Sequence, residues 1–86
     1  MSDAHGAEYR QRAGLAVEIL DGEALIWDEP AQALHRLNPA TTAVWEACAE
    51  WVAVAAIDAP LPRAEVEGSV RDLVELQLLR RRDSFE

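Results

Sequence analysis

The sequence predicts an α+β domain in which a three-stranded antiparallel sheet is followed by two or three helices. Three observations indicate this class. Short apolar runs alternate with polar residues over 15–37 around an Asp-Gly pair, Asn38-Pro39 opens a helical pattern, and residues 62–79 carry apolar side chains at helical spacing. Because 86 residues can enclose only one hydrophobic core, we expect a single domain.

The sheet is predicted from an alternating apolar pattern and a hairpin signal. Leu15, Val17 and Ile19 recur with a period of two, which is typical of a strand. Asp21-Gly22 then predicts a two-residue turn, because both residues tolerate a positive φ. The rest of the meander follows in order: a second strand over 24–27, turn chemistry over 28–32 and a third strand over 33–37.

The helices are predicted from their capping residues and breaks. Asn38 can cap a helix that has Pro39 in its first position, and we expect Leu37 to be buried where the third strand meets this helix. Residues 40–56 contain no Gly or Pro, so they form one long helix or two short ones with a bend near 49–50. Prolines break the chain at 58–62, and the last helix is expected over 62–79.

The chain ends are expected to lie outside the domain. Residues 1–13 show no apolar period and are predicted to be a flexible N-terminal arm. The domain is placed at residues 14–80, and residues 81–86 are expected to be a C-terminal tail. Arg80 to Arg82 would then lie near the negative end of the last helix, either as a basic contact patch or as solubilising charge.

Composition favours a binding module over an enzyme. Eight arginines and no lysine face sixteen carboxylates, and the net charge of −8 repels a phosphate backbone, so no nucleic acid partner is expected. His5 and His35 are the only histidines, and Cys48 falls on an apolar helix face, so we expect no catalytic residue, no metal site and no cofactor. Without a signal peptide or a membrane segment, the predicted location is cytoplasmic.

The other conspicuous side chains have structural explanations. The three tryptophans are interpreted as packing residues, because a core this small needs large side chains. The carboxylates of the last helix are interpreted as a solvated face. The residues concerned are Trp27, Trp45, Trp51, Glu65, Glu67, Asp72 and Glu75.

The third strand is the feature that indicates a function. Residues 33–37 would form a short edge strand with no proline inside it, and they include His35 and Arg36. Unpaired backbone groups on such an edge can accept a guest strand.

Three segments have patterns that point to one family: residues 24–30 (ALIWDEP), 37–48 (LNPATTAVWEAC) and 65–79 (EVEGSVRDLVELQLL). They resemble the PqqD-like family of small winged-helix proteins, which act as recognition elements for ribosomally made, modified peptides. The first two segments resemble its strand, Asp-Pro-type turn and Leu-Asn helix start, and the third resembles its late acidic helix. The similarity covers about residues 15 to 80 and implies a winged-helix-like fold.

The resemblance implies a non-catalytic peptide chaperone that binds the leader segment of a precursor peptide and presents it to a modifying enzyme. That enzyme would be a radical SAM maturase, a cyclase or a leader peptidase. The leader would pair with the third strand and lie against the last helix. The implied peptide-binding residues are Ala33, Leu34, His35, Arg36, Val66, Val70, Arg71 and Val74.

Two alternatives remain open at the level of sequence. The family's Asp-Gly turn and second helix start are missing after Cys48, which weakens the winged-helix assignment more than the edge strand. A winged-helix DNA-binding or regulatory protein is one alternative function, although the acidic last helix disfavours it. A subunit or inhibitor that only docks to a protein partner is the other. An exposed edge also permits a homodimer.

Overall fold

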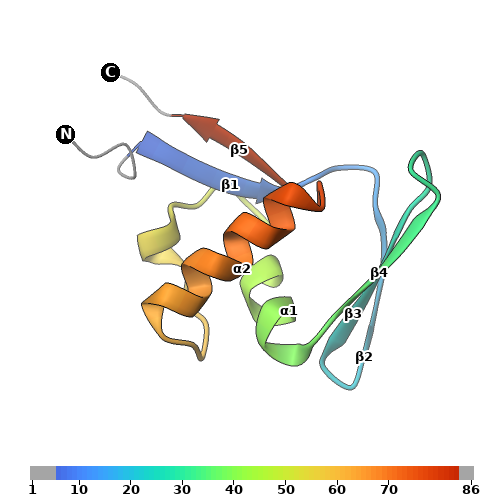
Figure 1. The fold of residues 1–86 in the computed structure, drawn as a ribbon, viewed down its shortest axis with the longest axis horizontal. Helices are drawn as coiled ribbons and strands as arrows, with labels where there is room; N and C mark the ends of the chain where they lie inside the picture. Colours follow the sequence, from blue (N-terminus) through green and yellow to red (C-terminus); the bar gives the residue numbers. More distant parts are fainter. Residues whose placement is uncertain (1–5, 84–86) are drawn as a thin grey trace.

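The computed structural model describes residues 6–83, which form two small antiparallel sheets and two α-helices. Figure 1 shows the three-stranded sheet at one end of the molecule, with β1 and β5 side by side away from it and α2 packed against β5. The elements are β1 (Ala7–Gln11), β2 (Ala16–Leu20), β3 (Glu23–Asp28), β4 (Ala33–Leu37), α1 (Pro39–Glu46), the 3-10 turn η2 (Val54–Ala56), α2 (Arg63–Glu75) and β5 (Leu79–Asp83).

The predicted three-stranded antiparallel sheet is confirmed. Its order is β2-β3-β4, and β4 covers the five residues predicted for the third strand. The hairpin turn has φ values of 53° at Asp21 and 80° at Gly22. Such values match a two-residue turn whose twist suits the flanking strands. Leu37 is buried, as predicted, at the junction with α1.

The helix start at Asn38-Pro39 is also confirmed, but the helix is shorter than either predicted alternative. The Asn38 side chain accepts a hydrogen bond from the Thr41 N–H at 2.8 Å, and α1 ends at Glu46. Beyond it, Val52 exchanges two backbone hydrogen bonds with Tyr9, at 2.8 and 3.0 Å. This pairing holds the segment after α1 in an extended form, which is incompatible with a helix continuing to residue 56.

The predicted end of the last helix, at residue 79, is wrong, because α2 stops at Glu75. Gln77 has a φ of 64°, and its N–H donates to the Val74 carbonyl. The Leu78 N–H donates to the Leu73 carbonyl at 2.9 Å. These two bonds are those of a Schellman motif, in which a residue of positive φ reverses the chain. Leu73 and Leu78 are both fully buried, so an apolar contact also stabilises this reversal of the chain.

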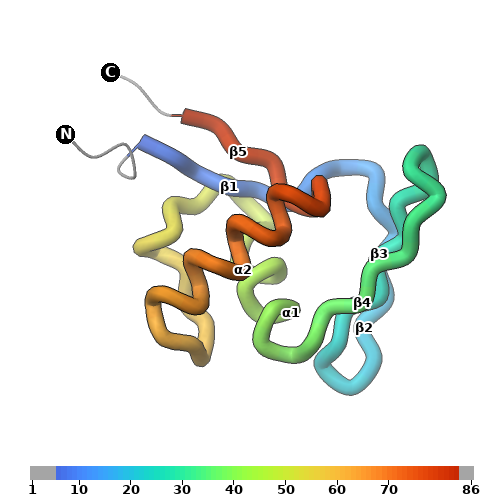
Figure 2. The backbone as a smooth tube through the Cα atoms, viewed as in Figure 1, coloured from blue at the N-terminus to red at the C-terminus, as the bar shows by residue number. Residues whose placement is uncertain are grey.

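The predictions of an N-terminal arm and a C-terminal tail are wrong for the parts that the structure describes. Residues 7–11 form β1, which pairs antiparallel with β5 from Ala7–Asp83 to Gln11–Leu79. Figure 2 shows these two ends of the described chain running side by side. The remaining parts of both predictions, residues 1–5 and 84–86, lie outside the described residues. We refer to β1, Arg12 and β5 together as the ribbon.

The core joins the two sheets through the helices. Apolar side chains from β3, α1 and α2 pack with the pair Leu78 and Leu79 at the start of the ribbon. Trp45 is buried in this core and donates from Nε1 to the Leu78 carbonyl at 3.2 Å. Its role as a packing residue is therefore confirmed.

One buried ion pair also links the ribbon to the three-stranded sheet. The Arg12 guanidinium lies 2.7 Å from Oδ1 of Asp28, whose side chain is 2% exposed. This contact does not have the angle of a hydrogen bond, and Oδ1 has no hydrogen-bond partner among the described residues. The residue that the sequence pattern assigns to a turn is thus a buried charge at the end of β3.

Candidate functional site

A threonine of α1 fixes the relative position of β3 and β4. The Ala24 N–H donates to Thr42 Oγ1 at 3.0 Å, and this hydroxyl donates to the Leu37 carbonyl at 3.1 Å. Ala24 and Leu37 are partners in the β3–β4 register, so their backbone groups face each other with the hydroxyl between them. This role of Thr42 could not be predicted from the sequence, because a threonine in the first turns of a helix is common and gives no sign of a distant partner.

This register determines which backbone groups of β4 are directed outward. Backbone N–H and C=O groups alternate in direction along an antiparallel strand. Since Leu37 directs its backbone groups toward β3, His35, two residues away, does so as well. The N–H and C=O groups of Leu34 and Arg36 then point to the opposite side. No strand of the described residues pairs there, so β4 presents an open edge.

The side chains of β4 alternate between two surroundings. Ala33 and His35 are half-buried on the face that packs toward the core, whereas Leu34 and Arg36 lie on the outer face. Leu34 is 64% exposed and is the most exposed large apolar side chain described. His35 therefore faces inward and Arg36 faces outward.

A hollow of about 330 Å³ lies on the outer face beside Arg36. The Arg36 guanidinium is 2.7 Å from the Glu23 carboxylate, and Leu20 and Leu25 complete the apolar part of the lining. Its wall therefore combines aliphatic surface, the arginine that Glu23 neutralises and the carboxylate of Asp21. This hollow could not be predicted from the sequence, since the alternation in β2 and β3 predicts a shared face but not which side chains border a hollow on it.

The structure does not gather the eight predicted peptide-binding residues into one surface. The four from β4 lie on the three-stranded sheet, whereas α2 packs against α1, η2 and β5. Val66 and Val70 are core residues, 4% and 3% exposed; Val74 is half-buried, and Arg71 is exposed. A guest strand on β4 would meet little of the two buried valines.

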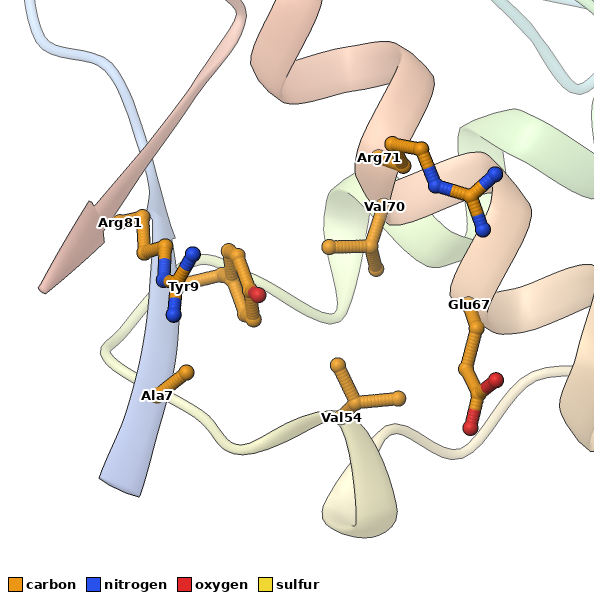
Figure 3. A pocket seen from close by; sticks show the side chains of 7 residues that line it. All are labelled: Ala7, Tyr9, Val54, Glu67, Val70, Arg71 and Arg81. Carbon is orange, nitrogen blue, oxygen red and sulfur yellow. The ribbon is translucent and has the colours of Figure 1, made fainter. Parts of the chain in front are cut away.

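Arg71 and Val70 instead border a second hollow, of about 410 Å³. Figure 3 shows it between the strand side, with Tyr9 and Arg81, and the helix side, where Val70 points toward Tyr9. Val54 of η2 closes the lower side of the view. The predicted site is thus divided between two regions that α1 separates.

The remaining reactive groups offer little chemistry. Cys48 is fully buried, and burial raises the pKa of its thiol to about 11, so it stays protonated at neutral pH. Within residues 6–83, no group of three His, Cys, Asp or Glu side chains lies close enough to hold a metal ion. Over the same residues, no helix is long and apolar enough to cross a membrane.

No protein-family model matches this sequence, and neither a curated protein nor a solved structure matches it. The resemblance to the PqqD-like family therefore stays a prediction.

Proposed function

We propose that this protein is a non-catalytic peptide-binding module that captures the leader segment of a precursor peptide on the open edge of β4. The observation that carries the proposal is the free backbone of that strand. Leu34 and Arg36 direct their N–H and C=O groups away from β3, and no proline interrupts the strand. Added strands of this kind obtain affinity from main-chain hydrogen bonds and specificity from alternate side chains.

The two faces of β4 suggest what the guest carries. Its outward side chains would lie beside the exposed Leu34 and beside Arg36, whose charge is already met by Glu23. An apolar guest residue, followed two positions later by a small polar one, fits that face better than a run of acidic residues. Only five residues form β4, so the complex belongs with the smaller, transient interfaces, below about 1,200 Å² in total.

The proposal includes membership of the PqqD-like family and a winged-helix-like relationship. The order of a three-stranded meander, an Asn-Pro helix and a late acidic helix supports it. In this reading the bound leader is delivered to a peptide-modifying enzyme in the cytoplasm. This chain differs from that pattern in two places: it has the ribbon, and it has a short segment after α1 in place of a second helix.

The alternative of a winged-helix DNA-binding protein receives less support. A recognition helix needs basic side chains to approach phosphates, but α2 has two arginines against four carboxylates. Its net charge of −2 opposes that role.

Proline substitutions at matched edge positions test the proposal. A labelled leader peptide from a precursor encoded beside this chain's gene is titrated against the wild type, Leu34→Pro and Arg36→Pro. Either proline deletes an outward N–H of β4 without removing a bond to β3, so binding should weaken by roughly tenfold or more. Val17→Pro is the control, because by the same alternation Val17 directs its N–H to the other open edge of the sheet, on β2.

The proposal is contradicted if all three variants lose affinity equally, or if none of them loses affinity. Circular dichroism must show that each variant is folded. Arg71→Glu is a further variant in the same titration. It should leave affinity unchanged if the guest stays on β4, and weaken it if the guest also reaches α2. Sedimentation of the free protein shows whether a second copy occupies the edge instead.

A further inference from the structure

The ribbon carries a charge opposite to that of the rest of the chain. Five of the eight arginines lie in residues 7–12 and 79–83, and only two carboxylates, Glu8 and Asp83, accompany them. Five positive charges less two negative ones leave the ribbon at +3, within a chain whose net charge is −8. Such segregation creates a local positive field that an anionic partner can sense.

Three of these arginines line a hollow of about 370 Å³ together with Trp51. Arg12 is occupied by Asp28, but Arg10 has only Glu50, at 3.8 Å and 83% exposed. Arg80 has no carboxylate within 4.0 Å among the described residues. Two guanidinium groups therefore remain available to an incoming anion.

Trp51 gives this hollow a flat apolar wall. The Arg82 guanidinium stacks 4.4 Å from the centre of its ring, and the same side chain lies 2.7 Å from the Glu8 carboxylate. These contacts hold Arg82 beside Arg80 on one face of β5. Glu8 occupies Nε and Nη2 of Arg82, at 2.9 and 2.7 Å, and leaves Nη1 for a second carboxylate, so Arg82 offers a weaker contact than Arg80.

The backbone of β5 has an open edge beside these side chains. On β1, Tyr9 exchanges hydrogen bonds with Val52, and Gln11 donates to the Cys48 carbonyl, so both turn their backbone groups away from β5. Arg81 and Leu79 are their register partners, and by the alternation of antiparallel pairs they direct N–H and C=O groups to the other side. No strand of residues 6–83 pairs there.

We infer that β5 is a second binding edge, which takes an extended acidic peptide segment with carboxylates at every second residue. Side chains at alternate positions of a guest strand share a face, so two such carboxylates would meet Arg80 and Arg82. The intervening guest residues would lie on the face of Arg81. This site is separate from β4 and does not depend on the function proposed for that strand.

Charge decides between this occupant and its competitors. A second copy pairing through β5 would set Arg80 to Arg82 against the same three arginines, which is repulsive. Duplex DNA would meet the ribbon favourably but be repelled by the acidic remainder of the chain. A short acidic peptide experiences only the ribbon.

The probe is a fluorescein-labelled peptide in which glutamate alternates with threonine. Its anisotropy is measured with the full chain, and the amide NMR signals are followed in the same titration. We expect saturable micromolar binding that shifts the Leu79 and Arg81 signals and weakens on the order of tenfold when salt is raised to several tenths molar. A shuffled peptide with its glutamates contiguous should bind several-fold more weakly.

R80Q/R82Q should weaken binding on the order of tenfold. R80Q alone keeps the contacts of Arg82 with Glu8 and Trp51, and it should weaken binding by roughly threefold if the ribbon stays folded. R63Q is the matched control for R80Q, because it removes one positive charge outside the ribbon, and it should leave binding unchanged.

Four results would overturn the inference. These are an equal loss in R80Q and R63Q, equal affinity for the alternating and contiguous peptides, shifts at Leu34 and Arg36 in place of the β5 signals, and tighter binding of duplex DNA than of the peptide. Absence of saturation at millimolar peptide would overturn it as well.

Discussion

The three-stranded sheet and the ribbon are built from the same kind of strand pair but differ in how far apart their partners lie in the chain. In the sheet, neighbouring strands are joined by hairpins, as Leu20 and Glu23 are across the Asp21-Gly22 turn. In the ribbon, Ala7 pairs with Asp83. Local pairing leaves a readable pattern in the sequence, whereas pairing between distant segments depends on the completed core.

The two regions also differ in what surrounds their strands. Turn chemistry and alternation define β4, and its open edge lies beside aliphatic surface and a neutralised arginine. Arginines dominate β5, and its open edge lies beside positive charge. One small domain thus offers two strand edges of different chemistry, which is the basis for assigning them different guests.

The largest expected effect comes from breaking the link between the regions. Arg12→Met leaves the buried Asp28 carboxylate without its counter-charge, which should cost about 3–5 kcal/mol of stability. Arg10→Met is the matched control, because its partner Glu50 is well exposed, and it should change stability by less than about 0.5 kcal/mol. Urea denaturation measures both, and equal losses would show that the regions are not joined through this pair.

The second prediction concerns the sheet side of the core. Leu37→Ala removes a side chain that is 5% exposed where β4 meets α1, and it should cost about 2–5 kcal/mol. Leu34→Ala, three residues earlier in β4 and on its outer face, is the control and should cost far less, since the Leu34 side chain is mostly exposed. A small loss for Leu37, measured by thermal unfolding, would mean that β4 is misplaced.

The third prediction tests the hydroxyl that fixes β4. Thr42→Val leaves the Ala24 N–H and the Leu37 carbonyl without their bridging partner and should cost about 1–3 kcal/mol. Thr42→Ser keeps the hydroxyl and should recover most of that loss. If valine and serine behave alike in urea denaturation, the hydrogen bonds do not set the register.

The smallest expected effect lies where α2 turns toward the ribbon. Gln77 has a φ of 64°, which glycine adopts without strain, so Gln77→Gly should stabilise the protein by about 0.5–1 kcal/mol. Glu75→Gly, inside the last turn of the helix, should instead lose about that much. A loss in both variants, seen in thermal midpoints, would argue against a left-handed residue at 77.

The contrast explains what the sequence could predict. Asp21-Gly22 and Asn38-Pro39 each specify a local geometry, so the sheet and the start of α1 could be predicted. The end of α2 could not, because Gln77 is neither Gly nor Asn and Leu78 continues the helical spacing. The strand of residues 7–11 could not either, since Ala7 and Tyr9 are too few to establish an apolar period and the partner strand, β5, lies near the other end of the chain.

The candidate sites follow the same rule. The open edge of β4 could be predicted, because it depends on three consecutive strands. Its neighbours could not, since Thr42 and Glu23 reach it only through the register. The placement of Val66 and Val70 beside β4, which rests on the family resemblance, finds no support in their burial in the core.

Amide hydrogen exchange followed by NMR tests the central claim, that β4 and β5 are each paired on one side and open on the other. Alternation predicts slow exchange at His35, Arg80 and Arg82, whose N–H groups face their partner strands, and exchange faster by about tenfold or more at Leu34, Arg36 and Arg81. Uniform protection along 33–37 would contradict an open edge on β4, and rapid exchange throughout 79–83 would contradict the ribbon.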